Sequence, residues 1–286
     1  MTLGLSTFVG PAVARSLLAP GFLAIAGIAA VATLILYAEH PRVSRQVVVS
    51  MVPWMVVGPA LALLGARTGY PTAIRPAVTG VGAYVTTYLL ACLTWFVLLQ
   101  LARGSRPSGG LPVYLASMGA GVATVVVGTL LVRTGSLSSV NLFWLAIAPI
   151  AAAAVAGIVL LLLGLWYTEA AAYTGMVGGL VVFGHALAAI GTAVAVVAHA
   201  GQTPLSLAVL NLLTAVGAAG MVGLPRQLLW AWGFVWIRLL LATLAIVLLT
   251  AYTRRHPNRG YLLLGFVAAV GVVGGVWSLL VMVVGP

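Results

Sequence analysis

A chain of 286 residues, of which 63% are hydrophobic and 5% charged, has too few polar residues to cover the surface of a soluble domain. The net charge of +11 comes from thirteen arginines and two acidic residues, and the chain has no lysine. The arginines are spread thinly over the chain and form no nucleic-acid-binding patch. We therefore predict an all-α polytopic membrane protein whose partner is the lipid bilayer, with no nucleic-acid partner.

Apolar runs long enough to cross a hydrocarbon layer about 30 Å thick recur along the chain. They predict eight transmembrane helices, over residues 21–38, 46–66, 78–102, 111–132, 142–166, 175–198, 227–252 and 260–284. The second span contains Pro53 and Pro59, and we expect a bend there because proline lacks the amide hydrogen that a helix interior uses.

One segment, 203–224, is visibly less hydrophobic than its neighbours. It is a ninth span, a re-entrant piece or an interfacial helix, and we favour one of the last two. With eight spans, seven arginines lie on one side of the membrane and five on the other. With nine spans the two counts change sides, so the sequence leaves the membrane orientation open.

Two parts of the chain repeat one pattern around its only acidic residues. Glu39 and Glu169 each follow an Ala-Gly-Ile motif at the same spacing, directly after Tyr-Ala or Tyr-Thr. Four spans in each half give both copies the same orientation in the membrane. We therefore predict two parallel four-helix repeats, residues 1–139 and 140–286, with an insertion at 200–226 in the second.

Glycines recur at helical spacing in both halves. They stand seven residues apart in each copy of the repeat, and four apart near the end of the chain: Gly58 and Gly65, Gly184 and Gly191, Gly271 and Gly275. Small residues allow membrane helices to approach closely. These faces predict tight helix packing, and they offer contacts for a homo- or hetero-oligomer.

Two polar residues lie near the centres of apolar spans, His185 in the sixth and Arg238 in the seventh. A central arginine costs at least about 2.5 kcal/mol on insertion scales, so it should face protein or water. Both side chains donate hydrogen bonds, which suits a lipid or small anionic ligand. The alternative is a structural role, in which backbone carbonyls satisfy both side chains.

Four further residues are candidate ligand-binding groups. Glu39 and Glu169 end their predicted spans at the depth of the lipid headgroups, where a carboxylate either has a role or is simply solvated or ion-paired. Tyr84 and Tyr88 belong to a polar stripe on the third span, which lines a cavity or packs within the bundle.

We predict no catalytic residues, no metal ligands and no cofactor. The chain contains no aspartate, and hence no Ser/His/Asp set, and it has no cluster of metal-binding residue types. His185 and His199 are spaced as in helices that hold two haems, about 21 Å apart along the axis. The second helix with two more histidines is missing, so haem binding is disfavoured.

The chain resembles an archaeal membrane family, the domain-of-unknown-function sixty-three group that is common in haloarchaea. The similarity rests on the run Val52 to Gly58, the Gly-Tyr-Pro ending at Pro71, and the run Phe183 to Leu187. It extends over most of the chain in span order. This chain has Ala188 where members tend to carry an acidic residue. It also lacks, between Gly274 and Ser278, the Arg-Asp pair that members carry near the end of the chain. The resemblance implies an integral membrane protein.

We expect a multi-pass protein of a prokaryotic cytoplasmic membrane. The first hypothesis is small-molecule or lipid binding, or transport, through a cavity at mid-membrane depth near His185 and Arg238. The second is a non-catalytic structural or accessory subunit without a site. A membrane enzyme that uses Glu39 and Glu169 has the least support, because the two acids lie at the membrane surface.

Overall fold

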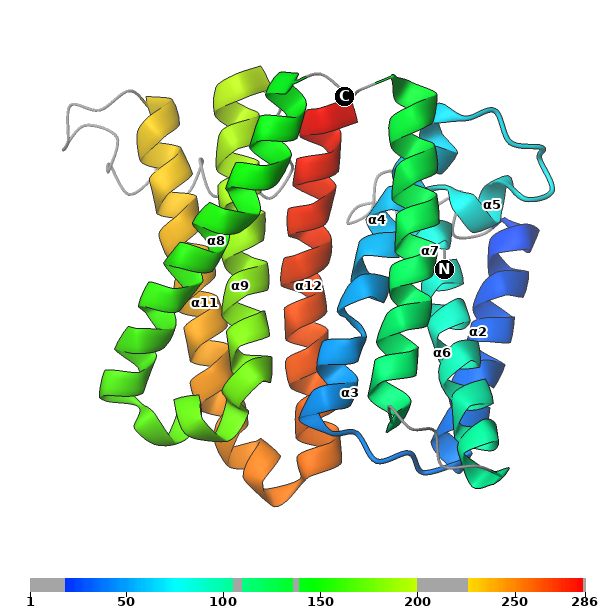
Figure 1. Ribbon diagram of the computed structural model, residues 1–286, viewed down its shortest axis with the longest axis horizontal. Coiled ribbons are helices and arrows are strands. Elements are labelled where there is room, and N and C mark those ends of the chain that lie inside the picture. The colour runs from blue at the N-terminus through cyan, green and yellow to red at the C-terminus, as the bar shows by residue number, and fades with distance from the viewer. Residues whose placement is uncertain (1–18, 105–109, 136–138, 200–225, 285–286) are drawn as a thin grey trace, which may run out of the picture. The chain divides into compact units, whose positions relative to one another are not determined.

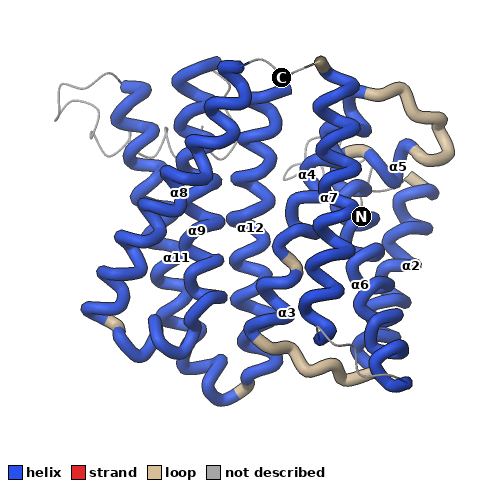
Figure 2. Tube along the Cα trace, viewed as in Figure 1, coloured by secondary structure: helices blue, strands red, loops and turns tan. Residues whose placement is uncertain are grey.

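The computed structural model of the chain describes residues 19–104, 110–135, 139–199 and 226–284, and the regular structure in these ranges is helical (Figure 2). Eight of the described helices are long and apolar enough to cross a membrane. They correspond to the eight predicted spans, and the all-α polytopic membrane fold is confirmed. The ambiguous segment 203–224 lies outside the described residues.

The helices cluster into two compact units. Unit 1 comprises residues 1–42 and 50–134, and unit 2 comprises residues 43–49 and 135–286. Unit 1 holds α2 (Pro20–Ala38), α4 (Val52–Arg67), α5 (Arg75–Val78), α6 (Gly80–Gly104) and α7 (Gly110–Thr134). Unit 2 holds α3 (Arg45–Ser50) apart from its last residue, α8 (Ser139–Trp166), α9 (Thr168–His199), α11 (Arg226–Arg255) and α12 (Pro257–Val284). The predicted duplication of one half into the other stays a prediction.

Helix α9 forms the core of unit 2. It packs most extensively on α12 and also contacts α8 and α11. In its most apolar stretch 67% of residues are buried, against 17% in α8, so α8 presents its surface to lipid. Helix α9 ends at the same end of the unit where α11 begins, which is the arrangement expected for the eight-span layout (Figure 1).

Helix α4 has the same central place in unit 1. It packs on α7 and α6, while α2 packs on α6. The indole of Trp54 lies against Gly119 of α7, and its Nε1 donates a hydrogen bond to the carbonyl of Leu115 over 3.0 Å. A Cβ atom at Gly119 would collide with the indole of Trp54, because the ring fills the space beside this glycine.

The second span is interrupted, but the break precedes the two prolines at which we expected a bend. Helix α3 ends at Ser50, and α4 begins at Val52 with Pro53 in its first turn. Proline is tolerated in a first turn because that amide hydrogen has no helical partner. Pro59 lies inside α4 without ending it. Helix α3 belongs to unit 2, where Val48 packs against Gly265 of α12.

The sixth span begins earlier than the hydropathy pattern predicts. Helix α9 starts at Thr168, and Gly175, with φ of 50°, makes a kink at the position where we expected the helix to begin. Glu169 therefore lies in the first turn of α9 and does not end the fifth span. An acidic residue is favourable there because helix N-termini carry partial positive charge.

The glycine faces are sites of close helix packing, as predicted. In unit 2 the backbones of α9 and α12 meet directly. A Cβ atom at Gly184 would lie 2.8 Å from the amide nitrogen of Val272, and one at Gly271 would lie 2.7 Å from that of His185. In unit 1, Gly58 similarly faces the ring of Tyr84. These glycines contact helices of their own unit, so an oligomer would need other faces.

The contact between α9 and α12 predicts that substitution by alanine has different effects at a glycine inside the contact and at a glycine outside it. Gly184→Ala places a methyl group against the backbone of α12, which cannot move aside as a side chain does, and should cost about 1–3 kcal/mol. Gly157→Ala on α8 meets nothing within 4 Å and should be neutral or stabilising by up to about 1 kcal/mol. Thermal melts of both variants in one detergent check this, and equal melting temperatures would contradict it.

Candidate functional site

His185 on α9 and Arg238 on α11 meet the same face of α12. A Cβ atom at Gly271 would lie 3.1 Å from Cδ2 of His185, and one at Gly274 would lie 3.6 Å from Nη1 of Arg238. The same position at Gly274 is 3.7 Å from the Cβ atom of Ala188, one turn beyond His185 on α9. We call this group of His185, Arg238, Gly271 and Gly274 the interior polar site.

Three nitrogen atoms of the interior polar site are buried without a hydrogen-bond partner among the described residues: Nδ1 and Nε2 of His185 and Nη1 of Arg238. The backbone of Val267 on α12 makes a weak hydrogen-bonding contact with the imidazole, which falls short of a full hydrogen bond. Buried polar groups in proteins are nearly always paired. Three unpaired nitrogens in one place therefore require an explanation.

Two backbone carbonyls on the helix faces beside Arg238 already accept hydrogen bonds from side chains. Thr192 donates its hydroxyl to the carbonyl of Ala188 over 2.7 Å, and Ser278 donates to that of Gly274 over 3.0 Å. Each carbonyl also accepts the amide hydrogen of its own helix, which uses both lone pairs. The two hydroxyls lie 3.2 Å from each other, so they too have partners.

The surroundings of the guanidinium are otherwise apolar. Its central carbon lies 5.0 Å from the centre of the Phe234 ring, in a cation–π arrangement on the same helix. The guanidinium faces the bundle interior, as the cost of exposing it to lipid predicts. Chemically, the interior polar site offers the donors of Arg238, one N–H of the imidazole and one permanent positive charge, which suit an anion or a carbonyl group.

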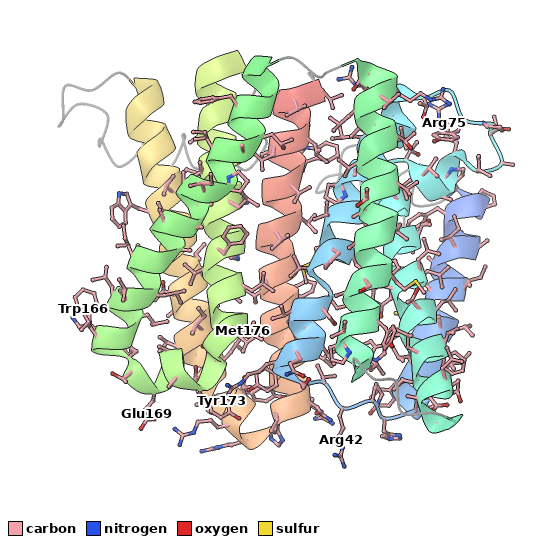
Figure 3. The ribbon with its side chains drawn as sticks, viewed as in Figure 1. Arg42, Arg75, Trp166, Glu169, Tyr173 and Met176 are labelled. Atoms are coloured by element: carbon pink, nitrogen blue, oxygen red, sulfur yellow. The ribbon has the colours of Figure 1, made fainter. Side chains whose placement is uncertain are left out.

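The two acidic residues do not belong to this site. Glu39, just beyond α2, accepts hydrogen bonds from Arg103 and from Nε2 of Gln100, the latter over 3.1 Å. Glu169 pairs with Nη1 of Arg254 over 2.7 Å at the end of unit 2 where α8 passes into α9 (Figure 3). Neither carboxylate is therefore available to balance the charge of Arg238.

The two ion pairs have the same place in their units. Arg103 lies in the last turn of α6, and Arg254 in the last turn of α11. Each of these helices is the third span of its half, and each acid follows the first span. The sequence comparison between the halves missed this correspondence, because loop arginines are common in the chain and none is distinctive by itself.

Tyr84 and Tyr88 lie in unit 1 and take no part in the interior polar site, which belongs to unit 2. The ring of Tyr84 packs against Gly58. The hydroxyl of Tyr88 lies 2.9 Å from that of Thr33 on α2, and the Tyr88 side chain is exposed. Of the six candidates, the structure thus brings together only His185 and Arg238. Their role in ligand binding stays a prediction.

Sequence reasoning also missed an aromatic clamp around Arg45. Its Nε donates to the hydroxyl of Tyr261 over 2.7 Å. Its guanidinium carbon lies 5.5 Å from the ring centre of Tyr173 and 5.9 Å from that of Tyr261. The two rings stack 6.5 Å apart at an angle of 8°. The clamp fixes α3 in unit 2, and its members are too far apart in sequence to be recognised from it.

The described residues contain no group of three or more His, Cys, Asp or Glu side chains that could hold a metal ion.

The two ion pairs should differ in strength. Glu39 is 20% exposed and receives two donors, whereas Glu169 is 83% exposed and receives one. Water screens the exposed pair, so Glu39→Gln should cost about 1 kcal/mol and Glu169→Gln less than about 0.5. Chemical or thermal unfolding in detergent measures both. A larger loss for Glu169→Gln would contradict the assignment.

The clamp predicts that Arg45→Lys is not a conservative change. Lysine lacks the planar group that stacks on two rings while donating in its own plane, so the variant should lose about 1 kcal/mol of stability. The matched control is Arg259→Lys, a change of the same kind at an exposed position of α12 that should be neutral. Equal unfolding midpoints for the two variants would show that the clamp contributes nothing.

Comparison with protein-family models, curated proteins and solved structures finds no match for this chain. The resemblance to the haloarchaeal family therefore stays a prediction, and the functional conclusion depends on the geometry of the interior polar site.

Proposed function

We propose that the protein binds a small anionic molecule or an anionic lipid at the interior polar site and carries or presents it within a prokaryotic cytoplasmic membrane. The single observation behind this proposal is the set of three buried nitrogens on His185 and Arg238 that have no hydrogen-bond partner in the part of the chain that the structure describes. A site of this kind is what a binder needs before its ligand arrives, because the ligand can supply acceptors for Arg238 and for the N–H of the imidazole.

Energetics support a ligand over an empty site. Leaving one buried donor unsatisfied costs about 1–3 kcal/mol, and more when the group is charged. An arginine inside a membrane adds a cost of its own. The chain retains these groups although Leu or Phe in the same places would pack without either cost. A function that uses the donors accounts for their presence.

The depth of the site also favours handling of a membrane solute. His185 lies about 15 Å along α9 from the kink at Gly175. Arg238 lies about 18 Å along α11 from its first residue and about 26 Å from its last. In a hydrocarbon layer about 30 Å thick these are interior positions. Binding sites of secondary transporters lie at comparable depth.

The alternative of a structural or accessory subunit has less support. It predicts that backbone carbonyls satisfy Arg238, but Nη1 of Arg238 is buried without a hydrogen-bond partner among the described residues. A membrane enzyme has the least support, because Glu39 and Glu169 are both engaged in ion pairs at the ends of helices. Neither acid lies near the interior polar site.

The test is Arg238→Leu, analysed by native mass spectrometry and by melting in a non-ionic detergent. We expect the wild-type protein to retain an anionic molecule through purification, and the variant to lose it. The ligand-free melting temperature should change little or rise, because removing a buried charge together with its desolvation cost is often neutral or stabilising.

The matched control is Arg254→Leu, which removes an exposed arginine from the same helix and should keep the bound molecule. Two results would overturn the proposal. One is a wild-type protein without any bound species, whose melting temperature no anion raises. The other is a bound species retained equally by the wild type and by Arg238→Leu.

A further inference from the structure

We infer that the ligand of the interior polar site is an amphiphilic monocarboxylate, a single carboxylate group on an apolar chain. The inference rests on the proposed function and specifies its ligand class. It follows from the charge at the site, from the shape of the available donors, and from the apolar groups around them.

Charge balance selects a monoanion. Arg238 supplies one permanent positive charge, and both acids of the chain are engaged elsewhere. One negative charge neutralises the site. A phosphate monoester carries about −1.5 to −2 and would bring excess charge into a region of low dielectric. A cationic ligand would meet the guanidinium with repulsion that little solvent screens.

The geometry selects a planar acceptor. The central carbon of the guanidinium lies 5.0 Å from the centre of the Phe234 ring, and its N–H donors point outward in the plane of the group, so a ligand has to meet them at its edge. A carboxylate matches that edge with two parallel hydrogen bonds, which a spherical ion cannot form. Its oxygens have lone pairs left for the imidazole of His185, which flanks the neighbouring turn of α12.

The surroundings select an apolar body. Phe234, Ala188 and the glycines of α12 offer no polar side-chain atom. The hydroxyls of Thr192 and Ser278 already bond to their own helices and lie beside each other. The hydroxyls of a sugar acid or the ammonium of an amino acid would therefore be buried without partners, whereas an apolar chain carries no such cost.

The experiment compares five probes that differ in one property each: decanoate, decanol, decylammonium, decyl phosphate and acetate. Each is added to the full-length protein in non-ionic detergent, and the melting temperature is measured. Decanoate at roughly ten times its Kd should raise the melting temperature by about 3 °C or more. Decanol and decylammonium should have no effect, and decyl phosphate and acetate should act only at concentrations at least tenfold higher.

Three variants locate the effect. Arg238→Leu should abolish the response to decanoate, and Arg238→Lys should weaken it and remove the preference for decanoate over decyl phosphate, because an ammonium group lacks the planar fork. His185→Phe should raise the Kd about tenfold or more, the loss of one hydrogen bond to a charged group. Arg254→Leu should respond as the wild type does. If Arg238→Leu fails to fold, the responses of Arg238→Lys and His185→Phe to decanoate still test the inference.

The outcomes separate the two proposals. Acetate as effective as decanoate would overturn the apolar body, and decyl phosphate more effective than decanoate would overturn the monocarboxylate; the site would survive both results. A response to decanol equal to that of decanoate would show detergent-like partitioning and overturn the inference. No response to any anion, with Arg238→Leu indistinguishable from the wild type, would overturn the proposed function itself.

Discussion

The direct contact between the backbones of α9 and α12 governs the chemistry of unit 2. It depends on glycines at which even one methyl group would collide with the facing backbone, as at Gly184 and Gly271. Because the helices meet without side chains between them, the neighbouring polar groups find few protein acceptors. The imidazole of His185 and the guanidinium of Arg238 lie beside this glycine face, and three of their nitrogens have no hydrogen-bond partner among the described residues.

Hydroxyl groups reinforce this effect. In apolar helices the hydroxyls of threonine and serine commonly donate a hydrogen bond to the carbonyl four residues earlier. Those of Thr192 and Ser278 do so. These hydroxyls occupy the carbonyls of Ala188 and Gly274, on the two helix faces that lie beside Arg238. The interior polar site is thus produced as much by bonds made around it as by the residues that form it.

Much of the fold follows from the sequence, because hydropathy identifies the segments that are apolar over a length sufficient to cross a bilayer. The eight spans were predictable for this reason. The start of α9 was not, since Thr168 to Thr174 are mostly small and polar, and the kink depends on the backbone of Gly175.

The sequence also identified His185 and Arg238, by depth alone. It could not tell whether carbonyls satisfied them, which depends on the rotamers of two hydroxyls. It did not identify the partners of Glu39, Glu169 and Arg45, because these contacts join distant parts of the chain. Arg103, for example, is 64 residues from Glu39. The derivation of the two halves from one ancestral unit stays a prediction. The matching positions of the two ion pairs are in keeping with it.

The position of α3 has a consequence for biosynthesis. Arg45 is among the first residues of the second span, yet it bonds to Tyr261, 216 residues later in the chain. At translation rates of about 5–20 residues per second, roughly ten to forty seconds separate the emergence of the two residues from the ribosome. During that interval α3 has neither its aromatic clamp nor its contact with Gly265. An early segment of the polypeptide therefore reaches its final position only when the last transmembrane helix has been made.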